Sequence, residues 1–165
     1  MIVLGIDPGV SLCGWALLER DGGRPTRWLD GGHAPAEAIV AQHAERASLV
    51  AIEWLANGLF ERKRHDALIG VARTEGGLAW LLDRVGVRVV KLSAGQWRAD
   101  VVGRASPSDA EIEAQIRRLI AGVPVPPTLT VEALNHALDA AGVAFAALHQ
   151  PGQQTRLALG RGARR

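Results

Sequence analysis

The sequence predicts an α/β domain built on a mixed five-stranded sheet flanked by helices. Apolar runs of strand length recur along the chain, and the first three are separated by short, turn-like segments, which favour antiparallel pairing. The later runs are separated by helical patterns, which the crossovers between parallel strands require. The 165 residues are 48% hydrophobic, enough for one domain with a core.

The first half of the chain supplies four of the expected strands. The Asp21-Gly22-Gly23 sequence is a turn signal, so the third strand should run antiparallel to the second. Pro35 can begin a helix that continues to about residue 45. The four expected strands are residues 2–7, 14–19, 26–31 and 49–53.

The second half supplies one more strand, at residues 87–91, and three helices. The helices are expected at residues 62–84, from an N-cap at Ser106 and a first-turn Pro107 to about residue 120, and from a cap at Thr130 to about residue 148. Residues 1–150 then form the domain, and the segment 151–165, rich in Gly, Gln and Arg, is expected to be a flexible basic tail.

Composition limits the classes of function. No apolar run approaches the roughly 20 residues of a membrane span, and Cys13 is the single cysteine, which excludes an internal disulfide framework and a cysteine-rich zinc site. We therefore expect a cytoplasmic protein. The formal charge is +2, but basic residues gather in Arg62-Lys63-Arg64 and in the tail. Such clusters favour a polyanionic partner, although a solvated basic face is as common.

Two of the buried strands end on a carboxylate. Asp7 follows "MIVLGI" and precedes Pro8-Gly9, and Glu53 ends "LVAIE". Asp7 either caps the turn or is held there to bind something. On the last helix, His136 and Asp139 are three residues apart and share one face, and the small residues that follow allow that helix to pack closely on the sheet. In such sheets, sites lie beyond the carboxyl ends of strands.

Together, "GIDPG…GWAL", "IE", "LSAGQWRADVVG" and "HALDAA" resemble the RuvC-like Holliday junction resolvases of the RNase H-like nuclease group, over roughly residues 1–148. The resemblance implies an RNase H-like fold and a metal-dependent endonuclease that resolves four-way DNA junctions by paired symmetric nicks. It also implies two Mg²⁺ ions per site, for which Mn²⁺ can substitute. The implied partners are a second copy of the chain, bound through the helix at 62–84, and a branch-migration motor; the implied location is the nucleoid.

Carried over by motif, the catalytic and metal-binding residues of the family fall on Asp7, Glu53, His136 and Asp139. Carboxylates suit this role because Mg²⁺ prefers oxygen ligands and two such ions can assist phosphodiester cleavage. On this interpretation Asp7 is a metal ligand rather than a turn cap. One position departs from the family, since Asp109 stands where a lysine is usual. Arg98 or Arg104 is expected to supply the missing positive charge.

The segment after Glu53 is expected to contact DNA. Phe60 is the candidate for an aromatic residue that stacks at the junction centre, and Arg62, Lys63 and Arg64 are candidates for phosphate contacts, as are Arg98 and Arg104. Trp54 is expected to pack against the core.

Three other functions stay open at this point. A YqgF-type nuclease that acts on RNA shares the fold and the early aspartate. An ATPase of the actin or sugar-kinase type also has an early Asp-x-Gly, but it needs two such domains and this chain is too short. A nucleic-acid-binding module with weak or lost catalysis stays open because of the Asp109 departure.

Overall fold

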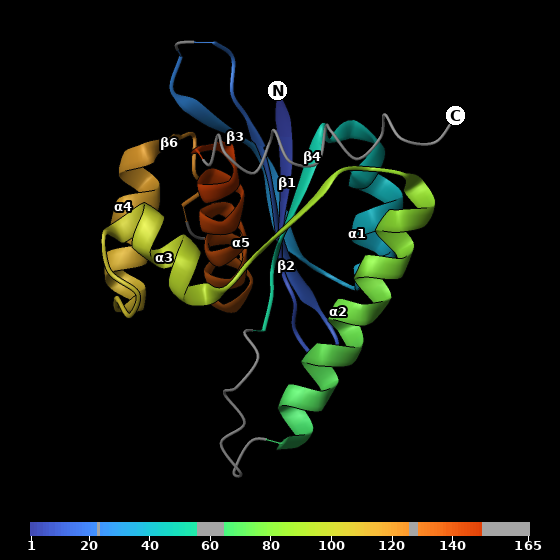
Figure 1. Cartoon of the computed structure of the whole chain (residues 1–165). Helices are drawn as coiled ribbons and strands as arrows, with labels where there is room; N and C mark the ends of the chain where they lie inside the picture. The colour runs from blue at the N-terminus through green and yellow to red at the C-terminus, as the bar shows by residue number, and fades with distance from the viewer. Residues whose placement is uncertain (23, 56–64, 126–128, 150–165) are drawn as a thin grey trace.

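A computed structural model describes residues 1–22, 24–55, 65–125 and 129–149. It has three layers, with a mixed sheet between two groups of helices. Figure 1 views the sheet nearly edge-on: α1 (Ala36–His43) and α2 (His65–Val85) cover one face. The opposite face is covered by α3 (Ala94–Val102), α4 (Asp109–Leu119) and α5 (Val131–His149). A 3₁₀ turn, η1 (Ala44–Arg46), follows α1.

The strands run in the order β5-β4-β1-β2-β3-β6 across the sheet. The first three pair antiparallel, β4 and β5 continue the sheet in parallel beyond β1, and β6 pairs in parallel with β3 at the other edge. Their bounds are β1 (Ile2–Asp7), β2 (Cys13–Glu19), β3 (Thr26–Ala34), β4 (Leu49–Glu53), β5 (Val89–Leu92) and β6 (Ile120–Ala121). The predicted α/β class and the mixed antiparallel and parallel pairing are confirmed.

The expected number of five strands is wrong by one. The sixth strand, β6, is two residues long and is defined by its pairing with Thr26 and Arg27 of β3. No local pattern identifies so short a strand, because its apolar content is that of the preceding helix. The third strand is also longer than expected, since it continues past residue 31 to Ala34 along its partner β2.

Two helices differ from the sequence prediction. α3 was not expected, although its start has a capping box in which Ser93 and Gln96 bond each other's backbone N–H, and its end has Gly103 with a φ of 87°. α4 begins later than expected. Its N-cap is Ser108 rather than Ser106, because the reciprocal capping partner, Glu111, lies three residues after Ser108.

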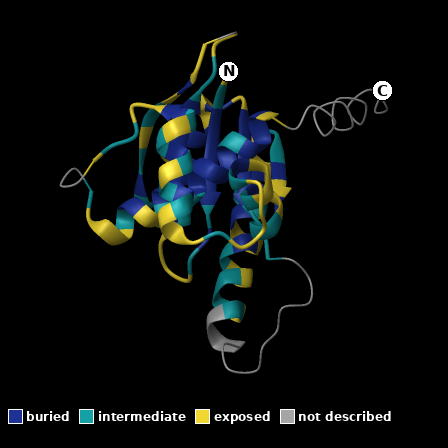
Figure 2. Ribbon diagram, turned by 90° about the vertical axis from the view of Figure 1, so that its left-hand side faces the viewer, coloured by how far each residue is buried: buried dark blue, intermediate teal, exposed yellow. Residues whose placement is uncertain are grey.

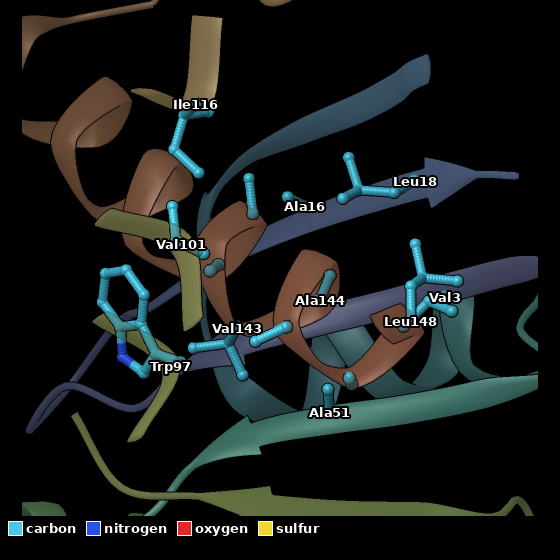
Figure 3. Close-up of a cluster of buried hydrophobic side chains, with 14 of the residues drawn as sticks. Val3, Ala16, Leu18, Ala51, Trp97, Val101, Ile116, Val143, Ala144 and Leu148 are labelled. Carbon is cyan, nitrogen blue, oxygen red and sulfur yellow. The ribbon is translucent and has the colours of Figure 1, made fainter. Parts of the chain in front are cut away.

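The core lies on both faces of the sheet. Figure 2 shows the central strands in the dark blue of buried residues. On one face α5 and the ring of Trp97 pack against β1, β2 and β4 (Figure 3). On the other face Leu78 and Leu82 of α2 pack against the sheet and are fully buried. The helix at 62–84 was expected to contact a second copy of the chain, but these two of its leucines belong to the monomer core.

Two glycines allow α5 to approach the sheet closely. A Cβ at Gly5 of β1 would lie 1.9 Å from the carbonyl oxygen of Ala140, and one at Gly14 of β2 would lie 2.3 Å from the carbonyl oxygen of His136. Any side chain at either position would push the helix outward. These two glycines therefore set the distance between α5 and the strand that ends in Asp7.

No helix among the described residues is long and apolar enough to cross a membrane.

Candidate active site

Asp7 and Glu53 lie at the same edge of the sheet. β1 and β4 are parallel neighbours in which Ile6 pairs with Ile52, so the next residue of each strand is a carboxylate at the strand's carboxyl end. The pairing places the two acids side by side although 45 residues separate them in the chain. The start of α5 and the start of α2 lie at this same end of the sheet (Figure 1).

His136 contacts Asp7 directly. Its Nδ1 lies 2.9 Å from Oδ2 of Asp7, and the imidazole of His33 from β3 stacks on the His136 ring with centroids 4.8 Å apart. The hydrogen bond with Asp7 raises the pKa of His136, and burial opposes this effect. Asp7 therefore uses its carboxylate to bind α5, which argues against the turn-cap interpretation.

Glu53 is held by an indole. Nε1 of Trp97 donates a hydrogen bond of 2.6 Å to Oε2 of Glu53, and the Trp97 ring is fully buried in α3. Burial raises the pKa of Glu53, and the negative charge of Asp7 raises it further, whereas the Trp97 hydrogen bond and Arg98 lower it. The indole thus orients the carboxylate and partly offsets the cost of its burial.

Asp139 lies one turn after His136 on α5, and its carboxylate is 3.9 Å from an Nη of Arg98. Burial, followed by the charges of Asp7 and Glu53, raises the pKa of Asp139 to about 7, against the lowering effect of Arg98. A shift of this size indicates that the three acids share one poorly solvated region. Carboxylates gathered in this way are disfavoured as free anions.

The donor set suits a hard divalent cation. Asp7, Glu53 and Asp139 offer carboxylate oxygens, and a cation among them would relieve the repulsion that, after burial, raises the pKa of Asp139. Within the described residues, however, no group of three or more His, Cys, Asp or Glu side chains is already arranged to hold a metal ion. Two of the donors face protein partners instead, since Asp7 contacts His136 and Glu53 accepts from Trp97. Each of these bonds uses one oxygen of its carboxylate, Oδ2 of Asp7 and Oε2 of Glu53, so the other oxygen of each can bind a cation.

Of the two arginines expected to supply positive charge, only Arg98 lies at the site. Arg98 lies at the site, beside Asp139 and 5.2 Å from the centre of the Trp97 ring. Arg104 lies away from it and pairs with Glu111 in the first turn of α4. Asp109, in the position where the family has a lysine, lines a cavity of about 250 Å³ together with His136 and Asp139. Its charge raises the pKa of Asp139 further, which is opposite to the effect of a lysine.

Other predicted contacts lie outside the described residues. Phe60, Arg62, Lys63 and Arg64 all fall in the segment 56–64, and the basic tail falls in 150–165. Trp54, expected in the core, is only half-buried, and Nζ of Lys91 lies 3.4 Å from its ring centre. That expectation is wrong because the Trp54 ring contacts a charged side chain at the edge of β5.

Sequence reasoning missed three side chains around the acids. Trp97 was visible only as part of a family-like segment, and its bond to Glu53 joins residues 44 positions apart. His33 gave no signal at all, since it lies near the end of β3 in a Gly-rich context. Glu75 of α2, which is buried and accepts the backbone N–H of Leu55, looked like any exposed helix residue. The burial of an acidic residue in a helix can be recognised only from the folded structure.

Comparisons with known proteins point in one direction. No protein-family model matches the sequence. The curated crossover junction endodeoxyribonuclease RuvC of Mycobacterium bovis is 27% identical over 132 residues, covering 73% of this chain and 70% of that protein. RuvC of Acinetobacter baumannii is 23% identical over 174 residues, covering 96% of this chain and 88% of that protein.

Among solved structures, that of Thermus thermophilus RuvC in complex with a Holliday junction substrate superposes with a TM-score of 0.71. The match covers 94% of this chain and 97% of that chain at 22% identity. The chain is RuvC-like in fold and in sequence. The RNase H-like fold expected from the early motifs is thereby confirmed, and the strand ends and α5 of this RuvC-like chain bear the acids carried over from the family.

Proposed function

We propose that this chain is a metal-dependent endonuclease that resolves four-way DNA junctions. The observation that carries the proposal is the meeting of Asp7, Glu53 and Asp139, from two strand ends and one helix, in a RuvC-like fold. Burial, followed by the charges of Asp7 and Glu53, raises the pKa of Asp139 to about 7. Stability alone gives no reason to gather acids in this way, whereas cation binding does.

The three carboxylates are the proposed ligands, with Mg²⁺ as the proposed ion. When bound, two such ions supply an activated water and neutralise the charge that develops on the leaving oxygen. Glu53 and Asp139 must be ionised to bind cations, and burial raises the pKa of both, which opposes ionisation; for Asp139, with a pKa of about 7, binding near neutral pH releases a proton. At Glu53 the hydrogen bond from the Trp97 indole reduces the cost of ionisation, because it favours the ionised carboxylate.

His136 and Arg98 have different proposed roles from the acids. His136 is the fourth donor of the site, and its contact with Asp7 sets the orientation of that carboxylate. A histidine donor also suits Mn²⁺, which is the proposed substitute for Mg²⁺. Arg98 is the cation nearest to Asp139 and is placed to neutralise part of a phosphodiester when the acids engage metal. Arg98 is proposed to supply the positive charge that a lysine at position 109 would provide.

The proposed nuclease acts as a homodimer. Resolving a junction needs nicks in two strands placed symmetrically about the crossover, and one acidic cluster cuts one strand at a time. The outer face of α2 supports this assembly, because Trp80 is 59% exposed there and Gly76 is exposed one turn before it. Phe60, Arg62, Lys63 and Arg64 are the proposed DNA contacts in the segment between Glu53 and α2.

One assay tests the proposal against its alternatives. The purified full chain is incubated with Mg²⁺ or Mn²⁺ and a four-way DNA junction, a linear duplex of the same sequence, or a structured RNA. Paired nicks in the junction, absent with Asp7→Asn, are the expected result. Cleavage of the RNA alone would identify an RNA-processing nuclease. Junction binding without any cleavage would identify a nucleic-acid-binding module, the alternative that Asp109 leaves open.

A further inference from the structure

Glu75 is a buried acid that the proposed reaction does not use. It lies in the middle of α2 and is 4% exposed, and among the described residues it is the one carboxylate in the buried class. Burial raises its pKa, which a backbone hydrogen bond and Lys91 oppose. A buried carboxylate without a partner is costly, so its contacts indicate why it is there.

The partner of Glu75 is the backbone just beyond Glu53. Oε1 of Glu75 accepts a hydrogen bond of 2.8 Å from the N–H of Leu55, two residues after Glu53. The backbone N–H of Trp54, which lies between Glu53 and Leu55, donates a hydrogen bond of 2.8 Å to the carbonyl oxygen of Leu92 in β5. The two amides that follow Glu53 are therefore tied to two different elements, one of them through a side chain.

The same stretch of α2 also contacts the turn that follows Asp7. A Cβ at Gly70 would lie 2.8 Å from a methyl of Val10, so the helix runs directly against that turn. The hydroxyl of Thr74 lies 3.4 Å from the Val10 carbonyl oxygen and bonds the Gly70 carbonyl at 3.2 Å. Residues 70–75 of α2 thus contact the chain just after each of the two strand-end acids.

We propose that Glu75 is a positioning residue of the acidic site, which fixes the backbone after Glu53 by accepting the Leu55 amide and so orients the Glu53 carboxylate toward Asp7 and Asp139. This role rests on the proposed nuclease function for its catalytic consequence. Trp97 holds the Glu53 side chain from the α3 side, and Glu75 holds its backbone from the α2 side, so Glu53 is fixed from both layers of helices.

A matched pair of variants tests the role. Glu75→Gln keeps the Oε1 acceptor and the side-chain length, whereas Glu75→Met has nearly the same volume and no comparable acceptor. Asp83→Asn, an exposed acid of the same helix, is the control. Each full-length variant is measured for melting temperature, junction affinity in Ca²⁺, single-turnover cleavage in Mg²⁺, exchange of the Leu55 amide, and the NMR shift of the Trp97 indole N–H.

The expected pattern separates positioning from stability. Glu75→Met should speed exchange of the Leu55 amide and slow cleavage, each about tenfold, move the Trp97 indole resonance, and leave junction affinity within about twofold. Glu75→Gln should restore the three readouts that change, the Leu55 exchange, the cleavage rate and the indole resonance, even if it melts at a lower temperature. Wild-type cleavage by a folded Glu75→Met protein, or a Leu55 amide that exchanges freely in the wild type, would overturn the role.

The NMR readouts do not depend on catalysis. A wild-type protein that cuts no junction would refute the proposed nuclease function, while the Leu55 amide and the Trp97 indole would still show whether Glu75 orients Glu53. Should Glu75→Met fail to fold, exchange of the Leu55 amide in the wild type and in Glu75→Gln decides the question. Protection in both supports the role, and its absence from either one contradicts it.

Discussion

The indole of Trp97 donates a hydrogen bond to the carboxylate of Glu53 across 2.6 Å and joins α3 to the end of β4. A fully buried tryptophan ordinarily serves the core, and the Trp97 ring does so by packing against Gly142 of α5. Its one polar atom, however, points at a proposed metal ligand. The same side chain therefore contributes to stability and to the orientation of the site.

Trp97→Phe should separate these two contributions. The loss of ring volume and of the hydrogen bond should lower the free energy of unfolding by about 1–3 kcal/mol, and misorientation of Glu53 should slow junction cleavage by about 10- to 100-fold. Because the indole lowers the pKa of Glu53, its removal should move the acid limb of the rate profile to higher pH. Trp28→Phe, a half-buried tryptophan of β3, is the control. An unshifted acid limb would contradict the orienting role.

Asp139 should make the metal-free protein less stable as the pH rises. Its pKa is 3.8 when unperturbed and about 7 in the fold, so between these values the folded chain binds more protons than the unfolded chain. Stability then falls from about pH 4 to about pH 7, by at most about 4 kcal/mol from this group. The raised pKa values of Glu53 and His136 act in the same direction.

Denaturant unfolding in chelator checks this dependence. Asp139→Asn should be more stable than the wild type at pH 8 and nearly equal to it at pH 4, because the asparagine cannot ionise. Added Mg²⁺ should stabilise the wild type more at pH 8 than at pH 5, and should stabilise Asp139→Asn less than the wild type. If the stability of the two proteins depends on pH in the same way, the pKa of Asp139 is not raised in the folded protein.

The acids and the histidine should respond differently to substitution. Glu53→Gln and Asp139→Asn should abolish cleavage while junction binding persists, because the proposed DNA contacts are basic residues elsewhere in the chain. His136→Asp should retain cleavage within about tenfold of the wild type, since an aspartate keeps a donor next to Asp7. Gel electrophoresis of nicked and bound junctions measures both properties. Complete loss in His136→Asp would mean that the imidazole has a role of its own.

Junction binding should depend on salt through the basic cluster Arg62-Lys63-Arg64. If all three contact phosphates, replacing them with alanine should reduce the slope of log affinity against log salt by up to about 3. Arg24→Ala, which removes an exposed arginine paired with Asp21 in the β2–β3 turn, is the control. An unchanged slope in the triple variant would return the cluster to an ordinary solvated face.

The sequence was sufficient for features that are local. Short apolar runs predict the strands that end in Asp7 and Glu53, and helix periodicity predicts that His136 and Asp139 share one face. Contacts between distant residues were not predictable in this way. The bonds of Trp97 to Glu53 and of Glu75 to Leu55 depend on which helix packs on which face of the sheet.

Element boundaries failed for a related reason. The start of α4 is set at Ser108 by the reciprocal bonds with Glu111, yet Ser106-Pro107 offers an equally good local signal. The helix at 62–84 was expected to contact a second chain, but its apolar stripe with Leu78 and Leu82 packs on the sheet. A helical sequence shows that an apolar stripe exists, but not which partner covers it.

The outer face of α2 gives the sharpest test of the proposed homodimer. Among the described residues, a Cβ at Gly76 or Gly77 would meet no atom within 4 Å outside its own turn of helix, so this part of the chain has no steric need for either glycine. Replacing both with alanine should therefore raise the stability of the helix, by up to about 1 kcal/mol for each. If two copies pack closely through this face, the added methyl groups should weaken the dimer.

Sedimentation equilibrium and thermal melting of Gly76→Ala/Gly77→Ala measure these opposite effects. A higher melting temperature of the monomer together with a weaker dimer supports an α2 interface, and Trp80→Ala should weaken the dimer as well, because Trp80 is exposed on the same helix. A dimer as tight as the wild type would place the interface elsewhere. A wild-type protein that stays monomeric, free and on junction DNA, would exclude paired nicking, because one acidic cluster then faces two strands that must both be cut.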